Sequence, residues 1–113
     1  MEELKKLLIE FREERDWSQF HSPKNLAMAL SVEVSELLEI FQWKTEEESA
    51  NLDSLQHRHA EEEIGDIMVY ITFICDKLNI DPVEAAKKKM EINRKKYPVE
   101  LAKGNAVKYN ERS

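Results

Sequence analysis

The chain has 113 residues, of which 42% are hydrophobic and 35% are charged, and its formal net charge is −6. This length predicts one domain over residues 1–113, and the low content of glycine and proline favours an all-α fold over a β-sandwich or barrel. No apolar run approaches the ~20 residues of a membrane span, the single cysteine excludes a disulfide framework, and the negative charge disfavours polymeric nucleic acid. We therefore expect a cytoplasmic protein with neither a membrane nor a nucleic-acid polymer as its partner.

Two helices are expected in the first half of the chain. Apolar residues at helical spacing predict the first over residues 2–16, and the pattern then breaks, so residues 17–21 are expected to form a loop. Ser22 is a typical helix cap and Pro23 suits the first helical position, which starts a second helix that ends near residue 42. Thr45 and Glu48 have the spacing of a capping box, so a short helical turn is expected after it.

Two more helices are expected in the second half. The third starts between residues 53 and 61 and continues to about residue 78, with apolar residues on two of its faces. Asp81 as cap, Pro82 at the first position and Glu84 in capping-box spacing start a fourth helix that reaches about residue 97. Pro98 ends it, and the polar tail over residues 99–113 is expected to be loosely structured.

Several acidic residues occupy positions where apolar residues are expected. On the second helix, Glu33 points into the apolar arc and Glu36 lies at its edge, whereas Glu39 points away and is expected to be solvated. On the third helix, Glu63 and Asp66 share the second apolar face with Tyr70, and a helix with two apolar faces is buried on most sides. These carboxylates should therefore be largely enclosed, where a carboxylate needs a partner or a metal ion.

The four acids form two matched pairs, Glu33-x-x-Glu36 and Glu63-x-x-Asp66. The i, i+3 spacing places each pair on one helix face, so two such helices side by side would bring four carboxylates together. Cations must then neutralise them, and a set of oxygen ligands favours Mg²⁺ when a phosphate is the other partner. Gly65 would allow close backbone approach at this point.

Two other interpretations of the acids are possible. Glu and Asp are frequent on helices, and most such pairs simply face solvent. A di-iron carboxylate bundle would need Glu-x-x-His, and none of His21, His57 and His59 has a glutamate three residues before it, so that class is disfavoured.

The acid pattern, together with three sequence blocks, resembles the MazG-like all-α nucleoside triphosphate pyrophosphohydrolases and, within them, the small dCTP pyrophosphatase branch. The blocks cover residues 15–21 (RDWSQFH), 41–45 (FQWKT) and 92–98 (INRKKYP). The resemblance implies hydrolysis of a (deoxy)nucleoside triphosphate to the monophosphate and pyrophosphate, with water attacking the α-phosphorus. It implies Mg²⁺ held by all four acids, and we expect Glu33 or Glu36 to orient the water.

The same resemblance implies a nucleoside pocket. Trp17, His21, Trp43 and Tyr70 match positions that line the pocket in that branch, where aromatic rings stack on the base. Asn93 lies within the apolar stripe of the fourth helix, where an amide needs partners, and a substrate could supply them. Each of these residues also has an ordinary structural use, in packing, in helix capping or in bonding the backbone.

One departure from the branch concerns base preference. The branch often carries a histidine where this chain has Leu8, which weakens the expectation of strict cytosine preference and leaves dUTP or a modified or oxidised triphosphate as alternatives.

The apolar surface exceeds what one short four-helix unit can bury, so self-association is expected, as a homotetramer built from two dimers or as a homodimer. The function also has an alternative: a non-catalytic helical oligomer that binds nucleotide or protein.

Overall fold

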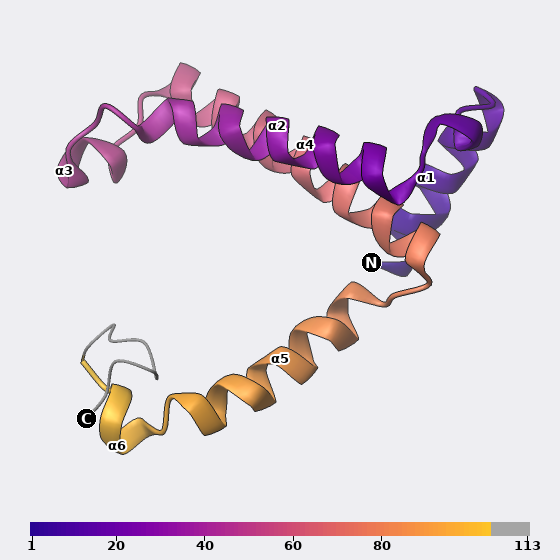
Figure 1. The fold of residues 1–113 in the computed structure, drawn as a ribbon. Helices are drawn as coiled ribbons and strands as arrows, with labels where there is room; N and C mark the ends of the chain where they lie inside the picture. Colours follow the sequence, from indigo (N-terminus) through magenta and orange to yellow (C-terminus); the bar gives the residue numbers. More distant parts are fainter. Residues whose placement is uncertain (105–113) are drawn as a thin grey trace. The chain divides into compact units, whose positions relative to one another are not determined.

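The structure, a computed structural model, describes residues 1–104, and within them it contains helices and no strand. The predicted all-α class is confirmed (Figure 1). No helix in this part of the chain is both long enough and apolar enough to cross a membrane. The helices are α1 (Glu2–Glu14), the 3-10 turn η1 (Ser18–Phe20), α2 (Pro23–Phe41), α3 (Glu46–Ser49), α4 (Ser54–Leu78), α5 (Pro82–Lys96) and α6 (Val99–Ala102).

The helix starts follow the predicted capping signals. The Ser22 hydroxyl accepts a hydrogen bond from the Asn25 N–H at 3.1 Å at the start of α2. At α3 the capping box is complete: Thr45 Oγ1 accepts from the Glu48 N–H at 3.1 Å, and Glu48 Oε1 accepts from the Thr45 N–H at 2.9 Å. Asp53 caps α4. These bonds satisfy N–H groups that the first turn of a helix leaves free.

The segment predicted as a loop over residues 17–21 contains the short η1 turn. Its bonds join residues three apart, from the Phe20 N–H to the Trp17 carbonyl and from the His21 N–H to the Ser18 carbonyl. Asp16 precedes it with a φ of 52°, a left-handed conformation that aspartate tolerates better than most residues.

The end of α4 divides the chain into two compact units, Met1–Ile80 and Asp81–Ser113. Asn79 takes a left-handed conformation with a φ of 55°, which is a common way to end a helix. Asp81 then caps α5 by accepting from the N–H groups of Val83 and Glu84. The single domain over residues 1–113 stays a prediction. Of the predicted loose tail, residues 99–102 form α6, and residues 105–113 lie outside the described residues.

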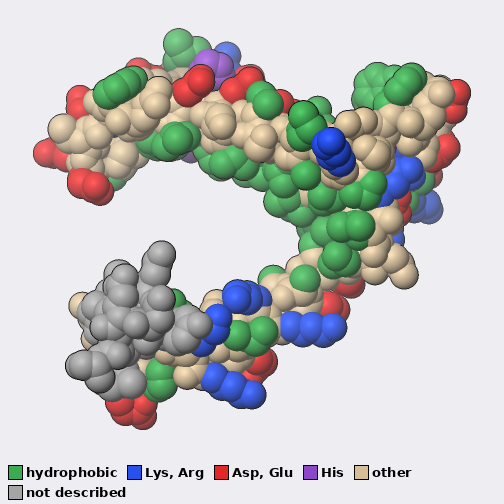
Figure 2. Space-filling view, viewed as in Figure 1, with side chains coloured by type: hydrophobic (Ala, Val, Ile, Leu, Met, Phe, Trp, Pro, Cys, Tyr) green, Lys and Arg blue, Asp and Glu red, His purple; other side chains and the backbone are tan. Residues whose placement is uncertain are grey.

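In the first unit, α2 and α4 pack side by side and run in opposite directions, and α1 packs against α4 (Figure 1). Leu26, which is 2% exposed, Ala60 and Phe73 are the buried apolar residues among those described. Hydrophobic side chains gather along one edge of the α2–α4 pair in Figure 2. The exposed apolar residues of these two helices include Val34, Leu38, Ile64 and Met68. The core of the first unit is therefore small, and a large apolar area of α2 and α4 has no partner within this unit.

Two expectations about α4 are wrong for the chain by itself. A Cβ atom at Gly65 would meet nothing within 4 Å, so this glycine is not needed for close backbone approach within the chain. Asp66 is exposed and Glu63 is half-buried, although both were expected to be largely enclosed. The reason is that the first unit covers this second face of α4 unevenly: Phe73 is 4% exposed and packs against His21, whereas the face is exposed at Asp66.

Candidate metal centre

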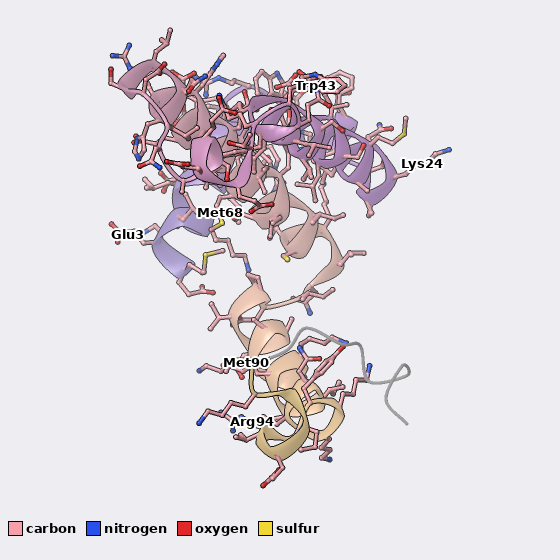
Figure 3. All side chains as sticks on the ribbon, turned by 90° about the vertical axis from the view of Figure 1, so that its left-hand side faces the viewer. Glu3, Lys24, Trp43, Met68, Met90 and Arg94 are labelled. Atoms are coloured by element: carbon pink, nitrogen blue, oxygen red, sulfur yellow. The ribbon has the colours of Figure 1, made fainter. Side chains whose placement is uncertain are left out.

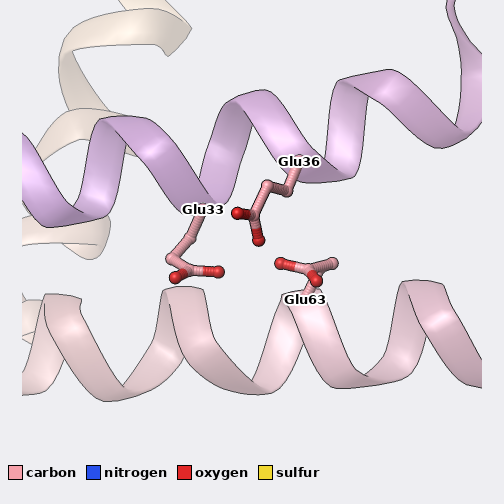
Figure 4. Close-up of side chains that lie close together, drawn as sticks. All are labelled: Glu33, Glu36 and Glu63. Carbon is pink, nitrogen blue, oxygen red and sulfur yellow. The ribbon is translucent and has the colours of Figure 1, made fainter.

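Three of the four predicted acids converge between α2 and α4. Glu33 and Glu36 extend from α2, Glu63 extends from α4, and the three side chains point toward one another (Figure 4). One carboxylate oxygen from each residue lies within 4.8 Å of those of the other two. The convergence follows from the i, i+3 spacing on α2 and from the packing of α2 along α4.

Asp66 lies outside this close group. It follows Glu63 by three residues on α4 and is exposed. Its negative charge nevertheless acts on the centre, because it contributes to raising the pKa of both Glu33 and Glu63. The role of Asp66 as the fourth ligand stays a prediction.

The negative charges of the centre change its protonation. The carboxyl group of Glu63, with which the protonated form of Glu33 can share a hydrogen bond, raises the pKa of Glu33 to about 7, together with burial and the charges of Glu36 and Asp66. The hydrogen bond from Glu33 lowers the pKa of Glu63, but burial and the carboxyl groups of Glu36 and Asp66 outweigh it, so this pKa is raised overall. Like charges held this close disfavour ionisation of every member of the group.

The carboxylates fit a divalent cation. Oε2 of Glu33 and Oε2 of Glu63 are buried and have no hydrogen-bond partner, and a buried polar atom without a partner is costly. A cation placed between the three side chains would contact such oxygens and offset their repulsion. Because the donors are carboxylate oxygens alone, the donor set suits a hard ion such as Mg²⁺.

A cavity of about 430 Å³ adjoins Glu36 and Glu63 on the side toward α3. Besides Glu36 and Glu63, it is lined by Gln56 and His59 of α4 and by Glu39 and Ile40 of α2. Glu39 is exposed, as predicted, yet it borders this cavity. Gln56 and His59 were not among the predicted site residues. The available signal was the spacing of His59, which precedes Glu63 by four residues and so shares its helix face.

Trp17 and His21 flank the η1 turn, which follows α1 in the first unit. The Trp17 ring meets the Phe11 ring edge-on, with 5.5 Å between centroids. The His21 ring packs against Phe73 at 4.7 Å, and its Nδ1 is buried without a hydrogen-bond partner. Burial, followed by the positive charges of Arg12 and Lys77, lowers the pKa of His21. The imidazole therefore favours its neutral form.

The other predicted pocket residues lie elsewhere. Tyr70 is half-buried on α4 between the acids and Phe73. Trp43, labelled in Figure 3, lies just beyond the end of α2 and is 88% exposed. Asn93 is exposed on α5, which belongs to the second unit.

Within the first unit, Trp43 and His21 are far apart. The residues that follow Trp43, Lys44 and Thr45, line a cavity together with Gln56 near the start of α4, whereas His21 contacts Phe73 near its end. At 1.5 Å per residue, the stretch of α4 from Gln56 to Phe73 is about 25 Å long. The first unit alone therefore does not bring the two residues to one base.

The fold and the centre define the chain as an all-α protein with a carboxylate centre suited to a divalent cation. Sequence comparison agrees, because the sequence model of the MazG-like family matches residues 28–111. The chain belongs to the MazG-like family, and the predicted resemblance is confirmed.

Named relatives cover nearly the whole chain. It is 43% identical to dCTP pyrophosphatase 1 of Bos taurus in an alignment 113 positions long that covers 98% of this chain and 67% of that protein. The human protein of the same name is 42% identical, with coverage of 98% and 66%. The chain thus spans about two thirds of the length of these relatives. The crystal structure of a pyrophosphatase from Archaeoglobus fulgidus has a TM-score of 0.82 and 49% identity, and the match covers 87% of this chain and 92% of that one.

Proposed function

We propose that the chain hydrolyses a nucleoside triphosphate, with dCTP or a modified dCTP as its substrate, to the monophosphate and pyrophosphate in the presence of Mg²⁺. The names of its relatives, dCTP pyrophosphatase 1 and a pyrophosphatase, support the enzyme class of nucleoside triphosphate pyrophosphohydrolase. The observation that carries the proposal is the meeting of Glu33, Glu36 and Glu63 between two helices, with buried oxygens that have no partner. The substrate would come from the cytoplasmic nucleotide pool.

In the proposed reaction, the oxygen of a water molecule bonds to the α-phosphorus and the bond from this phosphorus to the bridging oxygen breaks. Pyrophosphate leaves, and a carboxylate takes the proton from the water. We assign the orientation of the water to Glu33 and Glu36.

Glu33, Glu36, Glu63 and Asp66 would hold the metal. Mg²⁺, when bound, would neutralise negative charge on the phosphates and lower the pKa of a water molecule bound to it. The acids therefore explain how a chain with a net charge of −6 can take a substrate that is itself an anion.

We assign nucleoside binding to Trp17, His21, Tyr70, Trp43 and Asn93. Aromatic rings stack on the flat face of a base, and a neutral His21 can donate or accept a hydrogen bond at the base edge. Because about 25 Å of α4 separates the surroundings of Trp43 from His21, we propose that Trp43 completes the pocket of a neighbouring copy. This requires a homodimer or, as we favour, a homotetramer built from two dimers.

A panel of triphosphates assayed for pyrophosphate release tests this function. We expect Mg²⁺-dependent release that is fastest with dCTP or a modified dCTP, and no release after chelation of the metal. Faster turnover of dUTP or of an oxidised triphosphate would keep the chemistry and change the base preference. A non-catalytic oligomer predicts no turnover of any triphosphate and thermal stability that chelation leaves unchanged.

The raised pKa of Glu33 predicts that Mg²⁺ binds more weakly as the pH falls. Mg²⁺ needs the carboxylate form, and the ionised fraction of a group with a pKa of about 7 falls about tenfold between pH 8 and pH 6. We therefore expect an increase of about tenfold in the apparent Kd for Mg²⁺ over this range, measured by calorimetry together with proton release on binding.

The stability of the metal-free protein should show the opposite dependence. Because folding raises this pKa from 4.5, the contribution of Glu33 to stability is present below about pH 4.5 and is lost as the pH rises through 7.

For Mg²⁺ binding, an equal affinity at pH 6 and pH 8 would contradict the assignment of Glu33 as a ligand.

A further inference from the structure

An ionic contact that joins residues 64 positions apart holds α1 against α4. Nη1 of Arg12 donates a hydrogen bond to Oδ2 of Asp76 at 3.0 Å. Lys5 adds a longer ion pair to Oδ1 of Asp76 at 3.9 Å. One residue further along α4, Nζ of Lys77 donates to Oγ of Ser18 at 2.8 Å and to the Ser18 carbonyl at 3.3 Å. Asp76 and Lys77 thus bind both parts of the N-terminal arm, which we define as α1 together with η1.

The Arg12–Asp76 contact differs from a surface ion pair in its burial. Arg12 is only 5% exposed, and arginine is almost never fully buried unless it is paired. Other ion pairs of the chain, such as Glu84–Lys87 and Glu91–Arg94, join exposed side chains within α5 and contribute little. Arg12 has a second ionic partner in the adjacent Glu13, at 3.3 Å, but Asp76 is the partner that joins this buried side chain to α4.

The Arg12–Asp76 contact is linked to His21 through the Phe73 ring, which both Arg12 and His21 contact. The Arg12 guanidinium lies 5.8 Å from the centre of the Phe73 ring, and the same ring packs against His21. Phe73 and Asp76 are three residues apart on α4 and share its face. A shift of Arg12 would thus alter the packing of the ring on which His21 rests.

Arg12 also places Trp17 through the backbone. Its carbonyl oxygen accepts a hydrogen bond from the Trp17 N–H at 3.1 Å. The Trp17 ring packs edge-on against Phe11, one residue before Arg12. The Arg15 guanidinium lies over both rings, 3.6 Å from the Phe11 ring centre and 5.9 Å from the Trp17 ring. The position of the Trp17 ring therefore depends on where α1 is held.

We propose that Arg12 and Asp76, assisted by the contact of Lys77 with Ser18, act as a clamp that positions Trp17 and His21 for the nucleoside. The inference rests on the proposed function, since it assumes that these two residues contact the base. Arg12 and Asp76 are positioning residues: they lie behind the aromatic groups, touch no carboxylate of the metal centre and take no part in proton transfer. Their loss should weaken nucleotide binding and leave the chemical step unchanged.

The test compares Asp76→Asn, Arg12→Met and the double variant with Glu84→Gln, which removes an exposed ion pair of α5. Circular dichroism first establishes that each variant is helical, and Asp76→Asn, the milder change, carries the test should Arg12→Met fail to fold. We expect KM for dCTP to rise about three- to tenfold in both single variants, with kcat and the Mg²⁺ concentration for half-maximal activity within about twofold of wild type. In the double variant the rise should not exceed that of the larger single effect, because both changes break one contact.

Two kinetic results would overturn the clamp: an unchanged KM in Asp76→Asn, or a fall in kcat and Mg²⁺ affinity that matches the rise in KM. A readout without nucleotide separates this inference from the proposed function. In a Trp43→Phe background, Trp17 is the sole tryptophan, and its emission should shift to longer wavelength and be quenched more strongly by iodide in Asp76→Asn but not in Glu84→Gln. If wild type hydrolyses no triphosphate, the proposed function fails, and unchanged Trp17 emission in Asp76→Asn would overturn the clamp separately.

Discussion

Glu63→Gln is expected to reduce Mg²⁺-dependent hydrolysis by about a hundredfold or more, because losing one charged metal ligand removes several kcal/mol of transition-state stabilisation. Glu63 is the residue through which α4 contributes to the close group of acids. Glutamine has nearly the same shape and no charge, so the helix and its packing should remain. Pyrophosphate release over a range of Mg²⁺ concentrations measures the effect, and circular dichroism with light scattering checks the fold and the assembly.

Glu61→Gln provides the matched control. Glu61 is an exposed glutamate of the same helix, two residues before Glu63 and therefore on another face, and its replacement should leave turnover near the wild-type value. Full activity of Glu63→Gln at every Mg²⁺ concentration would show that the metal assignment is wrong.

Ile64→Lys is expected to break the proposed assembly and with it most of the activity. Ile64 is apolar and 52% exposed on α4, beside Glu63 and among other exposed apolar residues of the α2–α4 pair. Large exposed apolar areas mark interaction surfaces, and a lysine buried in such a contact without a partner is costly. Sedimentation should show a smaller particle, and hydrolysis should fall because pockets completed by a second copy are lost.

Ile64→Val keeps the apolar character of the position and should retain both the assembly and the turnover. A wild-type chain that sediments as a monomer, or an Ile64→Lys variant with unchanged mass and activity, would contradict the proposal that Trp43 acts in a neighbouring copy.

The helices could be predicted closely because their ends depend on local chemistry. Ser22 with Pro23 starts α2, and the Thr45–Glu48 capping box starts α3, as expected from side chains that bond the backbone within three residues. The 3-10 turn at Ser18–Phe20 was not predicted, since apolar periodicity carries no signal for a turn of three residues.

The site was only partly predictable. Glu33, Glu36 and Glu63 could be placed together because helical spacing assigns each to a face and apolar neighbours show which face packs inward. The spacing cannot show which outer faces remain open, and this is why the exposure of Asp66 and the free space at Gly65 differ from expectation. The Arg12–Asp76 contact joins separate helices and has no counterpart in any local pattern.

The unpartnered oxygens of Glu33 and Glu63 also have an evolutionary consequence. α2 and α4 form the largest packing contact of the described chain. Their packing brings carboxylates that repel one another close together, and this repulsion destabilises the folded state. Replacing such groups with apolar ones commonly makes a protein sturdier and inactive. Selection for thermal stability alone would therefore tend to eliminate this centre. Its presence means that the chain keeps a destabilising group of carboxylates at the site where a cation can bind.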